Sequence, residues 1–250
     1  MCEAKMWGFF NCTHYLHRAG QTNVILMDAS FAADSLDKVA IFAPPGRGKT
    51  TLVRLLTGMD RPRAGSILQP HDAWPLGYAG GFRAEMTGEQ NIRGLARIAG
   101  ISPDDLSAFV YDLTGLGDAF FLPVAYYTNR MKSRLGFAAS FGIPARLMIA
   151  DDKLISSDPE FREKYEAELH RRLNSAGLIF LASNPRPAEE VCDRFVVLHR
   201  ARFEEHDTYR SAADRLEEIM AYQDMEPAEP DDDTNGQDRA SEDLLYFDLV

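Results

Sequence analysis

The fold is decided by one stretch, Ala43-Pro44-Pro45-Gly46-Arg47-Gly48-Lys49-Thr50-Thr51. A short apolar run, Val39–Phe42, precedes it, and a helical pattern from Thr50 to Leu56 follows it. A glycine-rich loop between a strand and a helix is the setting of a Walker A phosphate loop. Gly46 and Gly48 let the backbone curl so that successive N–H groups face phosphate oxygens. We therefore predict that these nine residues bind a nucleotide, with help from the positive end of the helix.

Two side chains of this loop have the chemistry that a bound triphosphate needs. The Lys49 ammonium can reach the β- and γ-phosphates, and the Thr50 hydroxyl can ligate Mg²⁺. The first glycine of the motif is Ala43 here. If that position required positive φ, alanine would cost roughly 1–2 kcal/mol, whereas at negative φ a methyl group would be tolerated. The other interpretation of the stretch is a Gly/Pro turn that carries a surface lysine.

A second element of a P-loop enzyme is a strand that ends in an acid. The apolar run Arg146–Ala150 supplies it, because Asp151 and Asp152 follow directly. In such enzymes this acid holds Mg²⁺ beside the phosphate loop. We expect Asp151 to hold the metal and Asp152 to polarise the attacking water. A strand that simply ends in a turn would look the same, so the prediction depends on the loop upstream.

Composition limits the function classes. The chain has 250 residues, of which 45% are hydrophobic and 26% charged, as in ordinary globular proteins. The three cysteines have no metal-ligand or redox spacing, which suggests a reducing cytosol. We expect neither a secretory signal nor a membrane span, because no apolar run approaches about 20 residues. The net charge of −11 argues against nucleic-acid binding.

Most of this charge lies at the C-terminus. Residues 223–250 contain ten acids and one base, so the remaining body is nearly neutral. We predict a disordered acidic tail over 223–250. The tail ends in Leu244-Leu245-Tyr246-Phe247-Asp248-Leu249-Val250, an apolar cluster that resembles a short docking peptide. A pocket on a partner, or on this same chain, would accept Leu245 and Phe247.

The body alternates strands and helices, which predicts an α/β fold with a mostly parallel sheet. Further strands are expected near residues 24–27, 178–182 and 195–198. Helical patterns over 87–99, 103–114 and 132–141 interrupt the alternation. We therefore predict a P-loop NTPase (RecA-like) core over 1–222 with an inserted helical subdomain at about 86–144.

Beyond the loop, the sequence resembles the ATP-binding cassette (ABC) ATPases, in particular the capsule and O-antigen polysaccharide exporters. The resemblance covers about residues 13–215. It rests on four stretches: the Gly58, Pro62 and Gly65 spacing after the loop; Gly80-Gly81-Phe82 in the Q-loop region, with Met86-Thr87-Gly88-Glu89-Gln90-Asn91-Ile92; Tyr127-Thr128-Asn129-Arg130-Met131 before Arg134-Leu135-Gly136-Phe137; and Asp158 with Phe161 in the D-loop.

The resemblance implies roles for further residues. Tyr15 is the candidate aromatic that stacks on adenine, although it could equally be one aromatic of a strand, since His14 and His17 shift the alignment. Thr128, Asn129, Arg130 and Met131 occupy the signature that contacts the ATP of a partner subunit. Asn184 occupies the position of the switch histidine. Asp152 and Asn184 are therefore the predicted catalytic residues.

Four departures from the family bear on mechanism. Asp152 replaces a glutamate, and a poorly placed general base typically loses roughly 10²–10⁴-fold in rate. Asn184 cannot become a cation, which weakens stabilisation of charge in the transition state. Arg130 replaces the signature glycine, so it either blocks the partner's phosphate or pairs with it; a third interpretation is an inert helix N-terminus. The fourth departure is Ala43.

These features lead to one principal expectation. The resemblance implies an ATP-binding and Mg²⁺-dependent ATPase subunit that powers a membrane permease, with export of a capsular or related cell-surface polysaccharide. It would form a homo- or heterodimer and lie in the cytoplasm, peripheral on the inner face of the plasma membrane. A catalytically weak or inactive partner in a heterodimer is the alternative, and a P-loop kinase is a third interpretation that the helical insertion disfavours.

Overall fold

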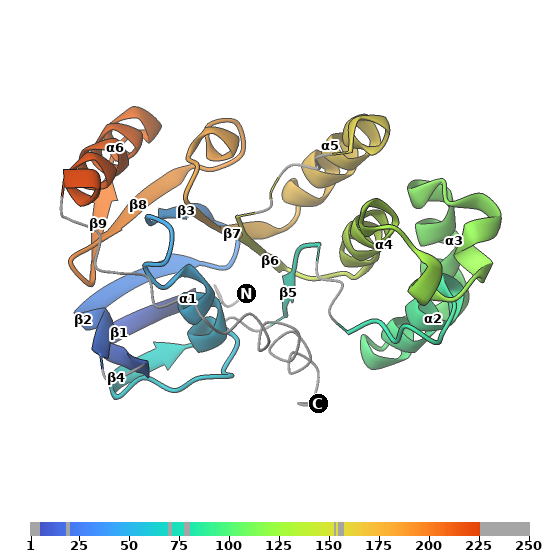
Figure 1. Ribbon diagram of the computed structural model, residues 1–250, viewed down its shortest axis with the longest axis horizontal. Helices are drawn as coiled ribbons and strands as arrows, with labels where there is room; N and C mark the ends of the chain where they lie inside the picture. Colours follow the sequence, from blue (N-terminus) through green and yellow to red (C-terminus); the bar gives the residue numbers. More distant parts are fainter. Residues whose placement is uncertain are drawn as a thin grey trace, which may run out of the picture. The chain divides into compact units, whose positions relative to one another are not determined.

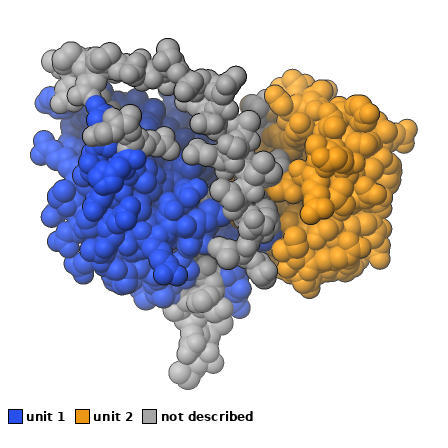
Figure 2. All heavy atoms as spheres, turned by 60° about the horizontal axis from the view of Figure 1, so that its bottom comes forward, with its two compact units in different colours: residues 1–74, 145–154, 170–226 blue, residues 75–144, 155–169, 227–250 orange. Residues whose placement is uncertain are grey.

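The computed structural model describes residues 6–18, 21–69, 72–77, 81–152, 154 and 158–225. These residues divide into two compact units (Figure 2). Unit 1 takes the described residues within 1–74, 145–154 and 170–226, and unit 2 those within 75–144 and 155–169. The predicted disorder of the acidic tail lies outside the described residues, except that helix α6 (Tyr209–Met225) includes the first three of the residues assigned to it.

Unit 1 is built around a six-stranded sheet in the order β5-β6-β7-β3-β8-β9. The strands are β5 (Ala73–Pro75), β6 (Leu147–Asp151), β7 (Gly177–Ala182), β3 (Lys38–Phe42), β8 (Arg194–His199) and β9 (Arg202–His206). Strands β6, β7, β3 and β8 run parallel, and β9 is antiparallel to β8. The α/β fold with a mostly parallel sheet is thus confirmed.

The central strands are buried on both faces, which explains their continuous apolar sequences. Every residue of β7 is buried, as are Val39–Phe42 of β3. Helix α1 (Lys49–Leu56) packs on β6. Helix α6 packs on β3, β8 and β9 and lies beside β9 in Figure 1. The sheet therefore has no water-facing central strand, as a crossover α/β fold requires.

A separate antiparallel sheet in the order β2-β1-β4 completes unit 1. It comprises β1 (Met6–Arg18), β2 (Gln21–Asp34) and β4 (Ala64–Leu68). Strands β1 and β2 are long and pair with register shifts between Phe9 and Tyr15. The backbone N–H of Met27 in β2 donates to the carbonyl of Ala201, 2.8 Å away, which ties this sheet to the β8–β9 turn.

Unit 2 is helical, and its helix boundaries are set by side-chain caps. Its long helices are α2 (Gly88–Ile98), α3 (Pro103–Thr114), α4 (Asn129–Gly142) and the first part of α5 (Pro159–Leu173), with 3-10 turns η1 (Gly117–Phe121) and η2 (Val124–Tyr126). Thr87 and Gln90 form a capping box, and Ser102 precedes a proline at the start of α3. Such caps contribute about 1 kcal/mol each.

Candidate functional site

The carboxyl ends of three neighbouring parallel strands meet at one edge of the unit 1 sheet. Strand β3 leads into the phosphate loop, β7 leads to Ser183 and Asn184, and β6 ends at Asp151. Ligands of open α/β sheets bind at this edge, because the loops that follow the strands gather there. The fold therefore brings together the loop and the two acids, as their positions in the sequence predicted, and Asn184 follows the strand between β6 and β3.

The phosphate loop has the backbone conformation that its glycines allow. Gly46 and Gly48 have φ of 73° and 95°, a region that side chains disfavour. Ala43, by contrast, is not among the described residues with positive φ, and its side chain is fully buried. Its N–H donates to the carbonyl of Ala182, 3.0 Å away in β7. The methyl group at this position is consequently tolerated without backbone strain.

Helix α1 begins directly at this loop, and its N-terminus is not capped by a side chain. Gly48 is the N-cap residue and has no side-chain cap hydrogen bond, and no acid stands in the first turn. Helix N-termini leave several N–H donors without intrahelical partners. Pro44 and Pro45 have no N–H, and the Arg47 N–H donates to the Pro44 carbonyl at 3.3 Å. The donors for a ligand must therefore come from Gly46 and residues 48–50. These donors fit an anionic phosphate group.

Gly48 offers a test of this loop geometry. A Cβ atom at Gly48 would stand 2.6 Å from Ile25 Cγ2 in addition to the unfavourable φ. We expect Gly48→Ala to lower the free energy of unfolding by about 1–2 kcal/mol or more. Gly94 in α2 is the matched control, because a Cβ there meets nothing within 4 Å.

Gly94→Ala is expected to raise stability by about 0.5–1 kcal/mol, since alanine is the better helix former. Urea unfolding of both variants gives the two free energies. If Gly48→Ala left the free energy of unfolding unchanged or raised it as Gly94→Ala does, the strained loop conformation would be wrong.

Lys49 and Thr50 place their polar atoms at the ends of β3 and β6. The Lys49 side chain is only 7% exposed, and its Nζ lies 3.5 Å from the Ala43 carbonyl oxygen and 3.4 Å from Asp152 Oδ2. Thr50 Oγ1 donates a hydrogen bond to Asp151 Oδ2 at 3.0 Å. A hydroxyl and a carboxylate oxygen held side by side are hard oxygen ligands of the kind that Mg²⁺ takes. The loop residues and Asp151 thus fit a nucleoside triphosphate with its magnesium ion.

The backbone and the carboxylate of Asp152 are both held by several contacts. Its φ is 54°, and its N–H donates to the carbonyl of Leu181 at 2.8 Å. Its Oδ1 accepts hydrogen bonds from the backbone N–H of Ser183 at 2.7 Å and the Ser183 hydroxyl at 2.9 Å. With Lys49 beside Oδ2, both oxygens of this short carboxylate have partners.

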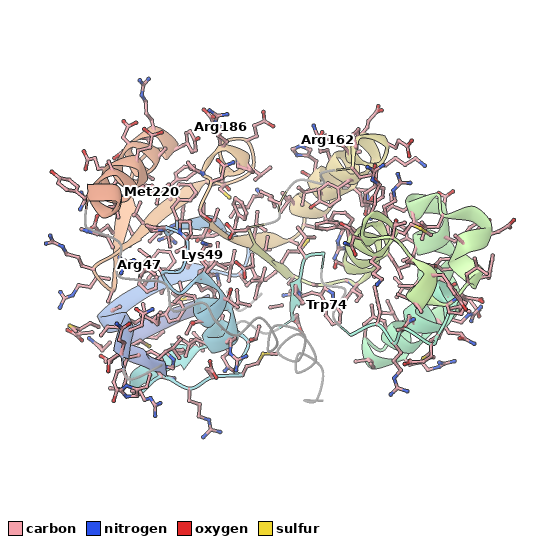
Figure 3. All side chains as sticks on the ribbon, viewed as in Figure 1. Arg47, Lys49, Trp74, Arg162, Arg186 and Met220 are labelled. Carbon is pink, nitrogen blue, oxygen red and sulfur yellow. The ribbon has the colours of Figure 1, made fainter. Side chains whose placement is uncertain are left out.

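Ser183 is a site residue that sequence reasoning missed. Its only signal was a hydroxyl at the carboxyl end of the strand that adjoins the loop strand. The neighbouring Asn184 is exposed, and its Oδ1 accepts a hydrogen bond from the N–H of Arg186 at 3.2 Å. Arg186 and Lys49 are both labelled in Figure 3. The side-chain oxygen of Asn184 therefore lies at the start of the turn η3 (Arg186–Ala188), whose N-cap residue is Pro185.

The structure does not bring Tyr15 into the pocket that adjoins the phosphate loop. Tyr15 lies half-buried on β1, opposite Val24 of β2. The Arg63 guanidinium stands 5.4 Å from the centre of its ring, and the His17 ring packs edge-on at 5.2 Å. Among the described residues that line the pocket, Val24 is present and Tyr15 is not. Its assignment to adenine stays a prediction.

The signature residues lie in unit 2, at the start of α4. Thr128 is the N-cap, and its hydroxyl accepts a hydrogen bond from the N–H of Met131 at 3.3 Å. Arg130 is 64% exposed, with its Nε 4.0 Å from Asp158 Oδ2. Asp158 itself is 5% exposed and accepts a hydrogen bond from Arg134 Nε at 2.5 Å. Hydrogen bonding from Arg134 holds the pKa of Asp158 below its usual range.

This ion pair predicts a pH dependence of stability. We expect Asp158→Asn to lower the free energy of unfolding by about 1.5–3 kcal/mol at neutral pH, because Arg134 loses a charged partner. A depressed folded-state pKa stabilises the fold above the unfolded pKa of about 3.9, and that contribution is lost as pH falls through the folded pKa.

The stability gap between the wild type and Asp158→Asn should therefore be constant from about pH 7 to 5 and shrink below about pH 4. Urea titrations across this range measure it. A gap that stayed the same at low pH would show that the carboxylate charge is not what stabilises this contact.

Part of the predicted Q-loop stretch lies outside the described residues. Of the Q-loop stretch, Gly80 is not among the described residues, whereas Gly81 and Phe82 are. Among the described residues, no group of three or more His, Cys, Asp or Glu side chains is arranged to hold a metal ion by itself. No helix in the described ranges is both long and apolar enough to cross a bilayer.

A phosphate loop between a central parallel strand and a helix, with an acid at the end of a nearby strand, defines a P-loop nucleotide-binding protein. No protein-family model matches the chain. It is similar to the ATP-binding protein BexA of Haemophilus influenzae, with 30% identity over 78% of this chain and 92% of that protein. It is 32% identical to the capsule polysaccharide export ATP-binding protein CtrD of Neisseria meningitidis serogroup B, over 77% and 91%.

Among solved structures, an ATP-binding subunit of an ABC transporter superposes with a TM-score of 0.72 and 20% identity. The superposition covers 86% of this chain and 99% of that one. The chain therefore belongs to the family of ABC ATP-binding proteins of capsule polysaccharide export.

Proposed function

We propose that this chain binds Mg-ATP at the phosphate loop and hydrolyses it. The observation that carries the proposal is the 3.0 Å hydrogen bond between Thr50 Oγ1 and Asp151 Oδ2, next to the uncapped N-terminus of α1. Those two oxygens come from residues 101 positions apart in the sequence, and the sheet brings them together. That arrangement suits a magnesium ion that neutralises phosphate charge.

The chain's own residues then act in sequence. The N–H groups of Gly46 and residues 48–50 and the Lys49 ammonium would hold the phosphates, and Thr50 and Asp151 would hold the metal. For this, Lys49 exchanges its present contacts with Asp152 and the Ala43 carbonyl for phosphate oxygens. Asp152 then loses one partner but keeps Ser183. Its Oδ2 is then available to orient a water, but the two hydrogen bonds from Ser183 to Oδ1 fix the short carboxylate in place. We expect this restricted reach to make hydrolysis slow.

The family sets the biological role that we propose. The chain is the ATPase subunit of an ABC exporter and drives a membrane permease that exports a capsular or related cell-surface polysaccharide. Two observations support this role: the similarity to CtrD, whose name states capsule polysaccharide export, and the 91% of CtrD that the match covers. We propose that the chain works in the cytoplasm, at the inner face of the plasma membrane, through the permease.

We further propose that two ATP-binding subunits meet across ATP. The signature supports this, because Arg130 is exposed at the start of α4, where it can face a partner. Residues 1–222 would form the ATP-binding domain, with a helical subdomain at about 86–144. The non-catalytic heterodimer partner is the less favoured role, because the Thr50–Asp151 pair is intact.

Cells that carry a variant gene test the exported substrate. In a strain whose chromosomal copy carries Lys49→Ala, we expect surface polysaccharide to fall to background and polymer to accumulate inside the cell. Lys164→Ala, an exposed lysine of α5, is the matched control and should leave the surface polysaccharide unchanged. Normal surface polysaccharide in the Lys49→Ala strain would refute the proposed role in export.

A further inference from the structure

A large pocket of unit 1 adjoins the phosphate loop without containing Lys49 or Thr50. Its volume is about 1040 Å³, and it lies between β2, the loop residues Pro44 and Arg47, the β8–β9 turn and α6. The side chains of Arg47 on the loop and Met220 on α6 are labelled in Figure 3. Binding of ATP by the loop does not explain why residues of α6 form one side of this pocket.

The pocket has a basic rim. Arg47, Arg200 and Arg215 line it, and no aspartate or glutamate is among its described lining residues. Arg215 is partly neutralised, since it pairs with Glu204 at 2.9 Å and Glu218 at 3.0 Å. Arg200 is exposed and holds a left-handed backbone conformation with φ of 49° in the β8–β9 turn. An occupant with negative charge fits this rim.

The pocket also exposes apolar side chains. Val24 is 38% exposed, Met27 51% and Tyr222 73%, and all three line it. Large apolar side chains that gather in one hollow are a common mark of a binding site. The complementary ligand is therefore a peptide that combines apolar side chains with carboxylates.

The chain itself carries such a peptide. Helix α6 lines the pocket up to Tyr222 and ends at Met225, and 25 residues follow. Residues 226–250 hold nine acids and one base, and they end with Leu244, Leu245, Tyr246 and Phe247 between Asp243 and Asp248. The combination matches the pocket in both charge and apolar character. In the sequence it follows directly on α6, the helix that lines the pocket.

The length of the segment allows it to return to the pocket. The 18 residues from 226 to 243 span up to about 60 Å when extended, since each adds about 3.3 Å. As a tether they would keep the terminal cluster at a local concentration in the millimolar range, so even a weak contact would be occupied. Ordering the segment has an entropic cost, which keeps the docked state reversible.

We propose that residues 226–250 dock in this pocket, with Leu245 and Phe247 on the apolar side chains and the carboxylates on Arg47 and Arg200. Because Pro44 and Arg47 belong to the phosphate loop, the docked segment opposes the binding of nucleotide phosphates. The second part of the proposal rests on the proposed ATP binding. The C-terminal segment is thus an autoinhibitory element of the ATP site.

Hydrogen exchange of the full chain tests the docking without any nucleotide. We compare the wild type with Leu245→Ser/Phe247→Ser, and follow the amides of 198–201 and 219–225. Exchange there should rise about three- to tenfold in the variant, while residues 106–141 of unit 2 stay unchanged. Equal exchange in both proteins would overturn the docking. Protection that depends on protein concentration would also overturn it, because a second copy would then be the occupant.

Calorimetry with Mg-ATP tests the competition. Leu245→Ser/Phe247→Ser and Arg200→Gln should each raise the affinity about three- to tenfold, and the triple change should add nothing further. Arg97→Gln, an exposed arginine of α2, is the matched control and should have no effect. Altered exchange with unchanged affinity would overturn the competition. If the wild type bound no ATP, the proposed function would fail, while the exchange result would still decide the docking.

Discussion

Lys49→Ala is expected to lower the affinity for Mg-ATP at least about thirtyfold, because loss of one partner of a buried charge pair costs about 2–5 kcal/mol. The Lys49 side chain is 7% exposed, so its ammonium makes few contacts with water and is poised beside the loop. Calorimetric titration of the purified chain measures the effect.

Lys164→Ala on the exposed side of α5 controls for the loss of a positive charge. The Lys49 variant also leaves Asp152 without its cationic neighbour, so its stability should be measured beside its affinity. If Lys49→Ala and Lys164→Ala bound ATP equally well while both were folded, the phosphate-loop assignment would be wrong.

Asp152→Glu combined with Asn184→His is expected to raise the turnover number at least about tenfold, given the 10²–10⁴-fold that a well-placed general base contributes. The longer carboxylate extends one methylene beyond the hydrogen bonds that hold Asp152 to Ser183. Histidine in place of Asn184 adds a group that can carry positive charge near the γ-phosphate.

The double change should exceed the product of the two single gains, because both groups act on one transition state. Steady-state phosphate release at saturating Mg-ATP is the measurement, and Asp152→Asn is the control that should lower turnover. No gain from the double change would mean that Arg130 or a missing partner limits the rate instead.

The phosphate loop could be predicted from sequence because its chemistry is local. A strand, a loop with two glycines, a lysine and a helix follow one another within 18 residues, Val39 to Leu56. No distant contact is needed to interpret this pattern. The position of Asp151 followed from a second rule, since parallel strands end at one edge of a sheet. Asp151 does lie beside the loop there, with Thr50 as its hydrogen-bond donor. Asn184 was identified only through the family resemblance.

Helix α5 was not predicted, although its pattern was in the sequence. Its buried apolar residues, Phe161, Tyr165, Leu169 and Leu173, recur at every fourth position and form one narrow stripe. The other positions are mostly charged, so the apolar pattern of the segment is weak. A narrow stripe of this kind, with one buried residue per turn, is enough for a helix that buries only one side.

The partners of Asp152 could not have been predicted from sequence. They depend on a left-handed backbone conformation at Asp152, which turns its carboxylate back toward Ser183 and Lys49. Aspartate tolerates that conformation better than most residues, but no sequence pattern indicates that it is used here. The length of strands β1 and β2 was also underestimated, because only residues 24–27 were expected to form a strand there. Their polar residues do not alternate strictly with apolar ones, so the pattern of a strand is weak.

The central claim is that the chain hydrolyses ATP with a magnesium ion held by Thr50 and Asp151. Phosphate release by the purified full chain, measured with and without Mg²⁺ beside the Asp151→Asn variant, tests it most directly. The account predicts slow, saturable release by the wild type that needs Mg²⁺ and is lost in Asp151→Asn. Equal release by the two proteins, or release that persists after chelation of Mg²⁺, would contradict it.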